Sequence, residues 1–375
     1  MPHSAALLRL VLAGGRLAPR RCLLERFAGD AVAAVGAGTR VWREAGLSEA
    51  QAACLRGRDG AAAEAEIRTL RWLEAADHHL IGWGDADYPA LLRQISGPPL
   101  ALFVSGEPGR LWHPQLAIVG SRAATPGGLD NARMFARAIA EAGFAITSGL
   151  ASGVDAAAHA GALEAGEGLT LAVVGTGPDI AYPVAHVRLR DAVAARGAVV
   201  SEHPPGTPPL RRHFPARNRL IAGLSLGTLV VEAAERSGAL ISARMAADAG
   251  REVFAIPGSI HNPMARGCHR LLREGAQLAE APDDVLSALA DACPALRDAL
   301  HVRLDAPIHE PGPVDPDIDA DHQKLWQALG HDPIPMDGLV ARTGLTVAEL
   351  SPMLLALELQ GRLAVEHGRY TRKSA

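Results

Sequence analysis

The stretch LAIVGSRAATPGG, residues 116–128, passes from a buried strand into a helix within a few residues. It opens with the continuous apolar run LAIVG, which is typical of a strand covered on both faces. Gly120 allows a tight turn, and an alanine-rich segment with helical spacing follows over 127–142. The stretch therefore predicts one strand–turn–helix unit of an α/β protein.

The same pattern recurs toward the C-terminus. Segments with helical spacing alternate with short apolar runs, and this alternation predicts a parallel sheet with helices on both faces. The runs cover 144–149, 169–175, 198–202, 228–233 and 252–258, and the helical segments cover 153–166, 184–196, 216–225 and 238–250.

The flanking regions differ in character from this α/β core, which we place at residues 111–300. Residues 1–80 are rich in Ala and Leu with helical spacing, and they predict a small helical, SAM-like domain followed by a connector over 81–110. Residues 301–320 combine prolines and acids without periodicity and predict a linker. Residues 321–375 predict three helices and a hairpin, the order of a winged helix, with Gly344 in the turn and Thr346 as an N-cap.

Composition excludes several classes of protein. The chain of 375 residues has a net charge of −4, which argues against a general polyanion binder but not against a local basic patch. Its four cysteines form no CxxC pair, so we expect reduced thiols, no zinc site and a cytoplasmic location. The N-terminal apolar run is interrupted by arginines, and no apolar stretch approaches the ~20 residues that span a bilayer.

Ligands of open parallel sheets bind beyond the carboxyl ends of the strands, and glycines and polar residues gather there in this sequence. Gly120, Ser121 and Arg122 follow the first core strand, where backbone amides and a helix N-terminus would favour an anion. The alternative is that any strand–helix turn favours glycine. The dinucleotide pattern G-x-G-x-x-G is absent, so a nicotinamide or flavin cofactor has little support, and we expect no cofactor.

Four arginines stand close together in LRRHFPARNRL, residues 210–220, and no Asp or Glu occurs from His203 to Val231. Arginines beside glycine turns, with His213 and Phe214 nearby, suit a phosphate backbone and an aromatic platform. The alternative is a solvated face whose acids come from elsewhere in the fold, with Glu202 and Glu232 as the obvious candidates. We favour polyanion binding.

Two further strand-end motifs have both a functional and a structural interpretation. Asp155 and His159 lie four residues apart on one helix and can meet, but no nucleophile accompanies them, so we favour a capped helix whose His is oriented by the Asp. Tyr182 could stack on a base or plug the loop against the core. Ser237 and Gly238 begin a helix rich in small residues.

Taken together, these strings resemble the DNA-processing protein A family (DprA, also called Smf). The match covers residues 87–276 nearly without gaps, and its strings are DYPALLRQI, AIVGSRAATPGG, SGLASGVDAAAH, SEHPPGTPP, FPARNRLIAGLS, VVEAAERSGALISA and REVFAIPG. One departure is RGCHRLLREGA at 266–276, where the family usually has G-T-N-x-L-I-x-x-G-A, so we assign no DNA contact there.

The resemblance implies an extended Rossmann-like core that binds single-stranded DNA in a basic pocket, forms a homodimer and delivers the RecA recombinase onto incoming DNA in natural transformation. Carried over by position, Arg122 matches the arginine of the family's G-S-R turn, 148–153 its S-G-L-A-x-G turn, and 217–219 its R-N-R. With the residues singled out above, the expected DNA-binding set is Gly120, Ser121, Arg122, Ser148, Gly149, Gly153, Tyr182, Arg211, Arg212, Arg217, Asn218, Arg219, Ser237 and Gly238.

We therefore expect binding without catalysis. The rival hypothesis is a nucleotide-processing enzyme of the N-glycosidase type on a related core, but its P-G-G-x-G-T-x-x-E signature is absent, since TPGG at 125–128 is followed by Leu-Asp-Asn. A second rival is a transcription regulator. The expected recognition helix at 346–361 carries no Arg or Lys, so duplex reading by the winged helix is disfavoured.

Overall fold

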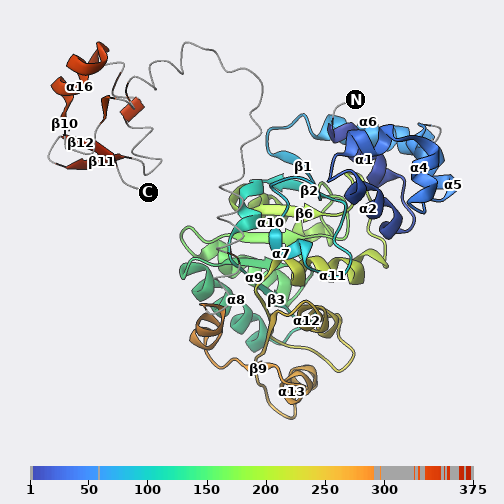
Figure 1. Cartoon of the computed structure of the whole chain (residues 1–375). Coiled ribbons are helices and arrows are strands. Elements are labelled where there is room, and N and C mark those ends of the chain that lie inside the picture. The colour runs from blue at the N-terminus through green and yellow to red at the C-terminus, as the bar shows by residue number, and fades with distance from the viewer. Residues whose placement is uncertain are drawn as a thin grey trace. The chain divides into compact units, whose positions relative to one another are not determined.

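The computed structural model of the chain consists of two compact units, residues Met1–Ala306 and Pro307–Ala375 (Figure 1). In the first unit it describes residues 3–57, 60–290 and 296. In the second unit it describes 325, 328–329, 334–347, 350, 353–354, 363–366 and 369–372. We describe each unit by itself.

A nine-stranded sheet forms the centre of the first unit, in the order β1-β2-β6-β5-β4-β3-β7-β8-β9. From β6 to β9 every neighbouring pair is parallel, whereas β1 and β2 are antiparallel additions at one edge. The strands are β1 His78–Gly82, β2 Ala101–Gly106, β3 Gln115–Val119, β4 Ala145–Ser148, β5 Thr170–Val173, β6 Ala198–Ser201, β7 Gly227–Val230, β8 Glu252–Ala255 and β9 Gln277–Leu278. The predicted α/β class with a large parallel sheet is confirmed.

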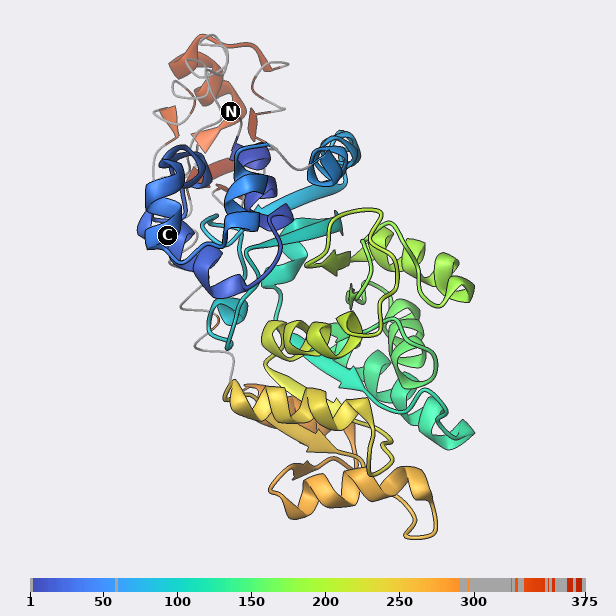
Figure 2. The same ribbon diagram turned by 90° about the vertical axis from the view of Figure 1, so that its right-hand side faces the viewer.

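Helices cover both faces because the core strands are apolar on both sides. Along β3, Leu116 and Ile118 pack in one cluster with residues of α8 and α9, whereas Ala117 and Val119 face a second cluster with α11 and α12. Figure 2 shows this succession of strands and helices from the N-terminal helices down to α13. The helices are α8 Pro126–Glu141, α9 Val154–Glu164, α10 Val187–Arg196, α11 His213–Leu224, α12 Gly238–Asp248 and α13 Arg266–Arg273.

The N-terminal region is helical, as its composition indicated. Its own buried cluster includes Leu7, Leu24 and Trp42, and the helices are α1 His3–Leu12, α2 Leu17–Arg26, α3 Ala31–Gly36, α4 Gly38–Glu44, α5 Glu49–Leu55 and α6 Gly60–Trp72. The structure adds what the sequence did not indicate: β1 and β2, near either end of the expected connector, extend the main sheet, because β2 pairs antiparallel with β6 and β1 pairs antiparallel with β2. The short helix α7, Ala90–Arg93, lies between them.

The second unit contains a three-stranded sheet in the order β10-β12-β11, built from Ile334–Pro335, Arg369–Arg372 and Leu363–Glu366. Helix α16, Met336–Thr343, ends at Gly344, whose φ of 72° is the left-handed conformation that favours glycine. The predicted helices at HQKLWQAL and TVAELSPMLLALELQG fall largely outside the described residues. Within the described part of the chain, no helix has both the length and the apolar character needed to cross a bilayer.

Candidate functional site

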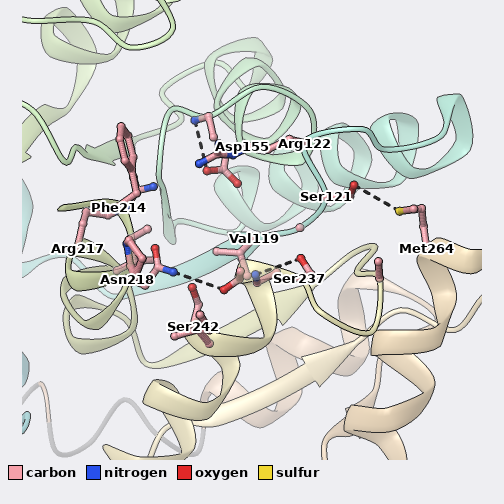
Figure 3. Close-up of a pocket in the computed structure, with 18 residues that line it drawn as sticks. Val119, Ser121, Arg122, Asp155, Phe214, Arg217, Asn218, Ser237, Ser242 and Met264 are labelled. Carbon is pink, nitrogen blue, oxygen red and sulfur yellow. Dashed lines mark hydrogen bonds between the residues drawn. The ribbon is translucent and has the colours of Figure 1, made fainter. Parts of the chain in front are cut away.

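A pocket opens where the direction of the chain through the sheet reverses. The chain runs outward from β3 through β4 and β5 to β6, then returns to β7 on the other side of β3. The loops after β3 and β7 therefore diverge and leave a crevice, which is the usual ligand site of such sheets. A pocket of about 400 Å³ lies there, and Figure 3 shows its walls.

The pocket gathers half of the residues that the sequence singled out. Those that line it are Gly120, Ser121, Arg122, Arg217, Asn218, Ser237 and Gly238. The rest lie outside its lining: Ser148 ends β4, Gly149 and Gly153 follow in the loop between β4 and α9, Tyr182 lies beside the lining residue Phe214, and Arg211 and Arg212 are exposed before α11. Arg219 does not line this pocket.

Arg217 is buried, with 4% of its surface exposed, although it lines the pocket. One guanidinium nitrogen, Nη1, donates to the carbonyl oxygen of Gly149 at 2.6 Å and to that of Val173. Burial lowers the pKa of Arg217 to about 10, while nearby Asp155 acts in the opposite direction. Its main contacts are therefore with the ends of β4 and β5, which it ties to α11.

Arg219 is the clearest departure from the expectation of an arginine cluster without acids. Its Nη2 forms an ion pair with Glu202, and both side chains are largely buried. Burial raises the pKa of Glu202, and the Arg219 charge opposes this rise. At this position the structure bears out the alternative that an acid comes from elsewhere in the fold, because Glu202, which follows β6, pairs with Arg219 of α11.

The anion at the N-terminus of α8 is a side chain of the protein itself. Glu232, after β7, accepts from the Thr125 amide at 2.8 Å, from the Thr125 hydroxyl at 2.7 Å and from Asn262 Nδ2 at 3.1 Å. A Cβ at Gly128 would lie 2.5 Å from the Glu232 carboxyl carbon, so this close approach requires glycine. The helix N-terminus that the sequence suggested for an external anion is thus occupied by Glu232.

At the mouth of the pocket an exposed cation meets aromatic rings. The Arg122 guanidinium carbon lies 5.8 Å from the centre of the Phe214 ring, within reach of a cation–π interaction. The Phe214 and Tyr182 rings are 5.2 Å apart with an interplanar angle of 44°. This rim combines a positive charge with flat apolar surfaces.

Asp155 and His159 do not form the pair that their spacing suggested. His159 Nδ1 lies 2.7 Å from the Thr170 hydroxyl, and burial lowers the pKa of His159 to about 3. Asp155 instead accepts from the Ala151 amide at 3.3 Å and lines the pocket, and burial raises its pKa. Thr170, rather than Asp155, therefore orients the buried imidazole.

Several lining residues escaped the sequence analysis. Phe214 was noted as a nearby ring but not assigned, and Ile241, Ser242 and Met264 were not considered. The Ser121 hydroxyl lies 3.5 Å from the Met264 sulfur, which brings the loop after β8 to the pocket. Among the described residues, no group of three or more His, Cys, Asp or Glu is placed to hold a metal ion.

These features define a class: a Rossmann-like α/β protein with a cation-rimmed pocket at the switch point of its sheet. The sequence profile of DNA recombination-mediator protein A matches residues 79–290, and that of the DprA winged helix domain matches 309–369. The chain belongs to the DNA recombination-mediator protein A family, also known as DprA or Smf.

Individual relatives agree with this assignment. The chain is 42% identical to Protein Smf of Escherichia coli K12 over 306 residues, which are 81% of this chain and 80% of that protein. It is 47% identical to DNA processing protein DprA of Streptococcus pneumoniae R6 over 203 residues, 54% of this chain and 71% of that protein. The X-ray structure of S. pneumoniae DprA matches with a TM-score of 0.65 at 38% identity, covering 74% of this chain and 95% of that one.

A second solved relative is DNA processing protein A of Helicobacter pylori, whose structure is described as showing a unique single-stranded DNA binding mode. It matches with a TM-score of 0.51 at 29% identity and covers 54% of this chain and 93% of that one.

Proposed function

We propose that this protein binds single-stranded DNA at the switch-point pocket and acts as a recombination mediator. The observation that carries the proposal is the rim, where the exposed Arg122 lies over Phe214 at the mouth of the pocket. Guanidinium groups bind phosphates and aromatic rings stack on bases of any sequence. The single-stranded DNA binding described for the H. pylori relative supports the same function.

The expected DNA-binding residues take two roles in this proposal. Arg122, Arg211 and Arg212 are exposed and contact phosphates, while Tyr182, which lies beside the pocket rather than in its wall, offers a ring to bases of a longer strand. The pocket wall offers polar groups from Gly120, Ser121, Asn218, Ser237 and Gly238. The remaining residues, Ser148, Gly149, Gly153, Arg217 and Arg219, position the wall through their contacts with neighbouring backbone and side chains.

Further elements of the proposal follow from family membership. In this view the protein acts in natural transformation in the cytoplasm, protects incoming DNA, loads the RecA recombinase and works as a homodimer without catalysis. A dimer would present two pockets to one strand and so increase the effective affinity.

The nucleotide N-glycosidase alternative has weaker support. Such an enzyme needs a carboxylate free to act on a nucleotide in the pocket. Glu232 is engaged by Thr125 and Asn262, and Asp155 accepts from a backbone amide. Incubation with nucleoside monophosphates tests this alternative, because release of base at ordinary enzymatic rates would establish it against the binding function.

Titration of a fluorescent single strand and of a duplex of equal length, at several salt concentrations, tests the proposed function. We expect tighter binding of the single strand and a log–log salt dependence with a slope of about −0.7 per phosphate contact. Equal affinity for both forms, or no binding of the single strand at low salt, would overturn the proposal.

A further inference from the structure

We propose that Tyr182 and Val184 form a second base-binding subsite outside the pocket, which takes nucleobases of the same strand after it leaves the pocket. The inference rests on the proposed function and adds the strand's onward path. We call the exposed surface made by Tyr182, Val184, Arg211 and Arg212 the outer platform.

The loops that carry the outer platform are fixed against each other. The Gly177 amide, after β5, donates to the carbonyl oxygen of Thr207, after β6, at 2.9 Å. His213 Nδ1, at the start of α11, lies 3.1 Å from the carbonyl oxygen of Gly175. Because these contacts exist in the protein alone, the platform needs little ordering when a strand arrives.

The outer platform exposes apolar surface on this fixed segment. Val184 is 76% exposed and Tyr182 43% exposed. The segment is held in place by His186, whose Nδ1 lies 2.9 Å from the carbonyl oxygen of Leu150. Exposed apolar side chains two residues apart on a fixed backbone are suited to an apolar ligand surface, such as the face of a base.

The outer platform adjoins the pocket and carries positive charge, which is complementary to a polyanion. Tyr182 contacts Phe214, which itself lines the pocket, so a chain of rings leads from the pocket to the platform. Arg211 and Arg212 are exposed just before Phe214, and neither forms a salt bridge within the part of the chain that the structure describes. Cations beside apolar surface favour phosphates and bases together, which single-stranded DNA supplies and a purely apolar protein partner does not.

The test compares short and long oligothymidylates of about 4 and about 16 nucleotides, end-labelled and titrated by fluorescence anisotropy. The variants are Tyr182→Ala with Val184→Ser, and Tyr182→Phe, which keeps the ring. Val32→Ser, at an exposed valine of α3, is the matched control. We expect the double variant to bind the long strand about tenfold more weakly while short-strand affinity, Tyr182→Phe and Val32→Ser stay at the wild-type level.

The outcomes separate this inference from the proposed function. If the wild-type protein binds neither length, the proposed function fails. If the wild type binds but the double variant matches it at both lengths, the second subsite is overturned. Equal loss for both lengths would place Tyr182 within the pocket site instead. Normal DNA binding with loss of recombinase loading would make the platform a protein contact, and this result too would overturn the inference.

Discussion

Arg217 and Gly149 fit together as a side chain and the space left for it. The Arg217 guanidinium donates to the Gly149 carbonyl oxygen at 2.6 Å, and a Cβ at position 149 would lie 2.6 Å from the guanidinium carbon. Helix α11 is therefore joined to the ends of two neighbouring strands through a buried cation. The glycine of this strand-end turn serves an internal arginine rather than an external ligand.

Replacement of Arg217 by Ala should destabilise the fold. The change removes both hydrogen bonds that Nη1 donates to the Gly149 and Val173 carbonyl oxygens and leaves a cavity in the core, so we expect a loss of about 3 kcal/mol in the free energy of unfolding. Urea denaturation measures it. Arg211→Ala, at an exposed arginine, is the control and should change stability by less than about 0.5 kcal/mol. An unchanged midpoint of urea denaturation for Arg217→Ala would mean that the guanidinium does not stabilise the fold.

Arg122→Glu should weaken single-strand binding without affecting stability. Arg122 is exposed at the pocket mouth, and charge reversal there replaces attraction to phosphate by repulsion. We expect affinity to fall by about tenfold or more and the salt dependence to become shallower. Arg40→Glu, at an arginine of α4 whose side chain is 90% exposed, is the charge-matched control. Equal losses in both variants would show a general charge effect rather than a site.

The buried imidazole of His159 should make stability depend on pH. Its pKa is about 3 in the folded protein, against a usual value of about 6.5 in the unfolded chain. Between these values the unfolded state binds more protons, so the His159 contribution is complete above about pH 6.5 and is lost as the pH falls toward 3, by up to about 1.4 kcal/mol per pH unit. Buried acids near His159 titrate as well, and they do so in the wild type and in a His159 variant alike. Comparing the two proteins therefore isolates the contribution of His159.

His159→Asn provides that comparison, because its side chain can still reach the Thr170 hydroxyl and does not titrate. Urea denaturation at about pH 7.5, 6 and 5 should give a smaller loss of stability with acid for the variant than for the wild type. Parallel curves for the two proteins would show that His159 is not held neutral by burial.

The sequence was a good guide to the fold because apolar runs and glycine turns are local signals. Each core run from 116 to 258 corresponds to a strand, and the loops that follow these strands supply the pocket. The edge strand β1 was missed because its sequence, HHLIG, begins with two histidines and gives no apolar run. The winged-helix hairpin was anticipated, and the structure describes strands at 363–366 and 369–372.

The site was harder to predict because its geometry depends on long-range contacts. The partners of Arg217 are carbonyl oxygens, which every residue has and which leave no trace in the sequence. Glu202 was recognised as a possible partner for the arginines, but which of them it meets depends on where α11 lies relative to the residue that follows β6. Met264 joins the pocket through the loop after β8, and its contact with Ser121 links residues 143 positions apart in the sequence.

Glu232 offers a test of how strongly the loops around the pocket depend on one carboxylate. It accepts three hydrogen bonds from Thr125 and Asn262, and its backbone oxygen accepts from the Ser121 amide at 2.7 Å. In Glu232→Gln an NH2 group replaces one carboxylate oxygen and faces a hydrogen-bond donor of Thr125 or Asn262. At least one of these hydrogen bonds is therefore lost at a buried position. We expect a loss of about 1–3 kcal/mol in unfolding free energy.

The same variant should also weaken single-strand binding, because the turn that carries Ser121 and Arg122 is fixed through Glu232. Urea denaturation and anisotropy titration on one preparation measure both effects. Glu235→Gln, three residues along and exposed, is the matched control and should leave both unchanged. Full stability and full affinity in Glu232→Gln would show that the carboxylate does not fix this turn. The N-terminus of α8 would then again be a candidate site for an external phosphate.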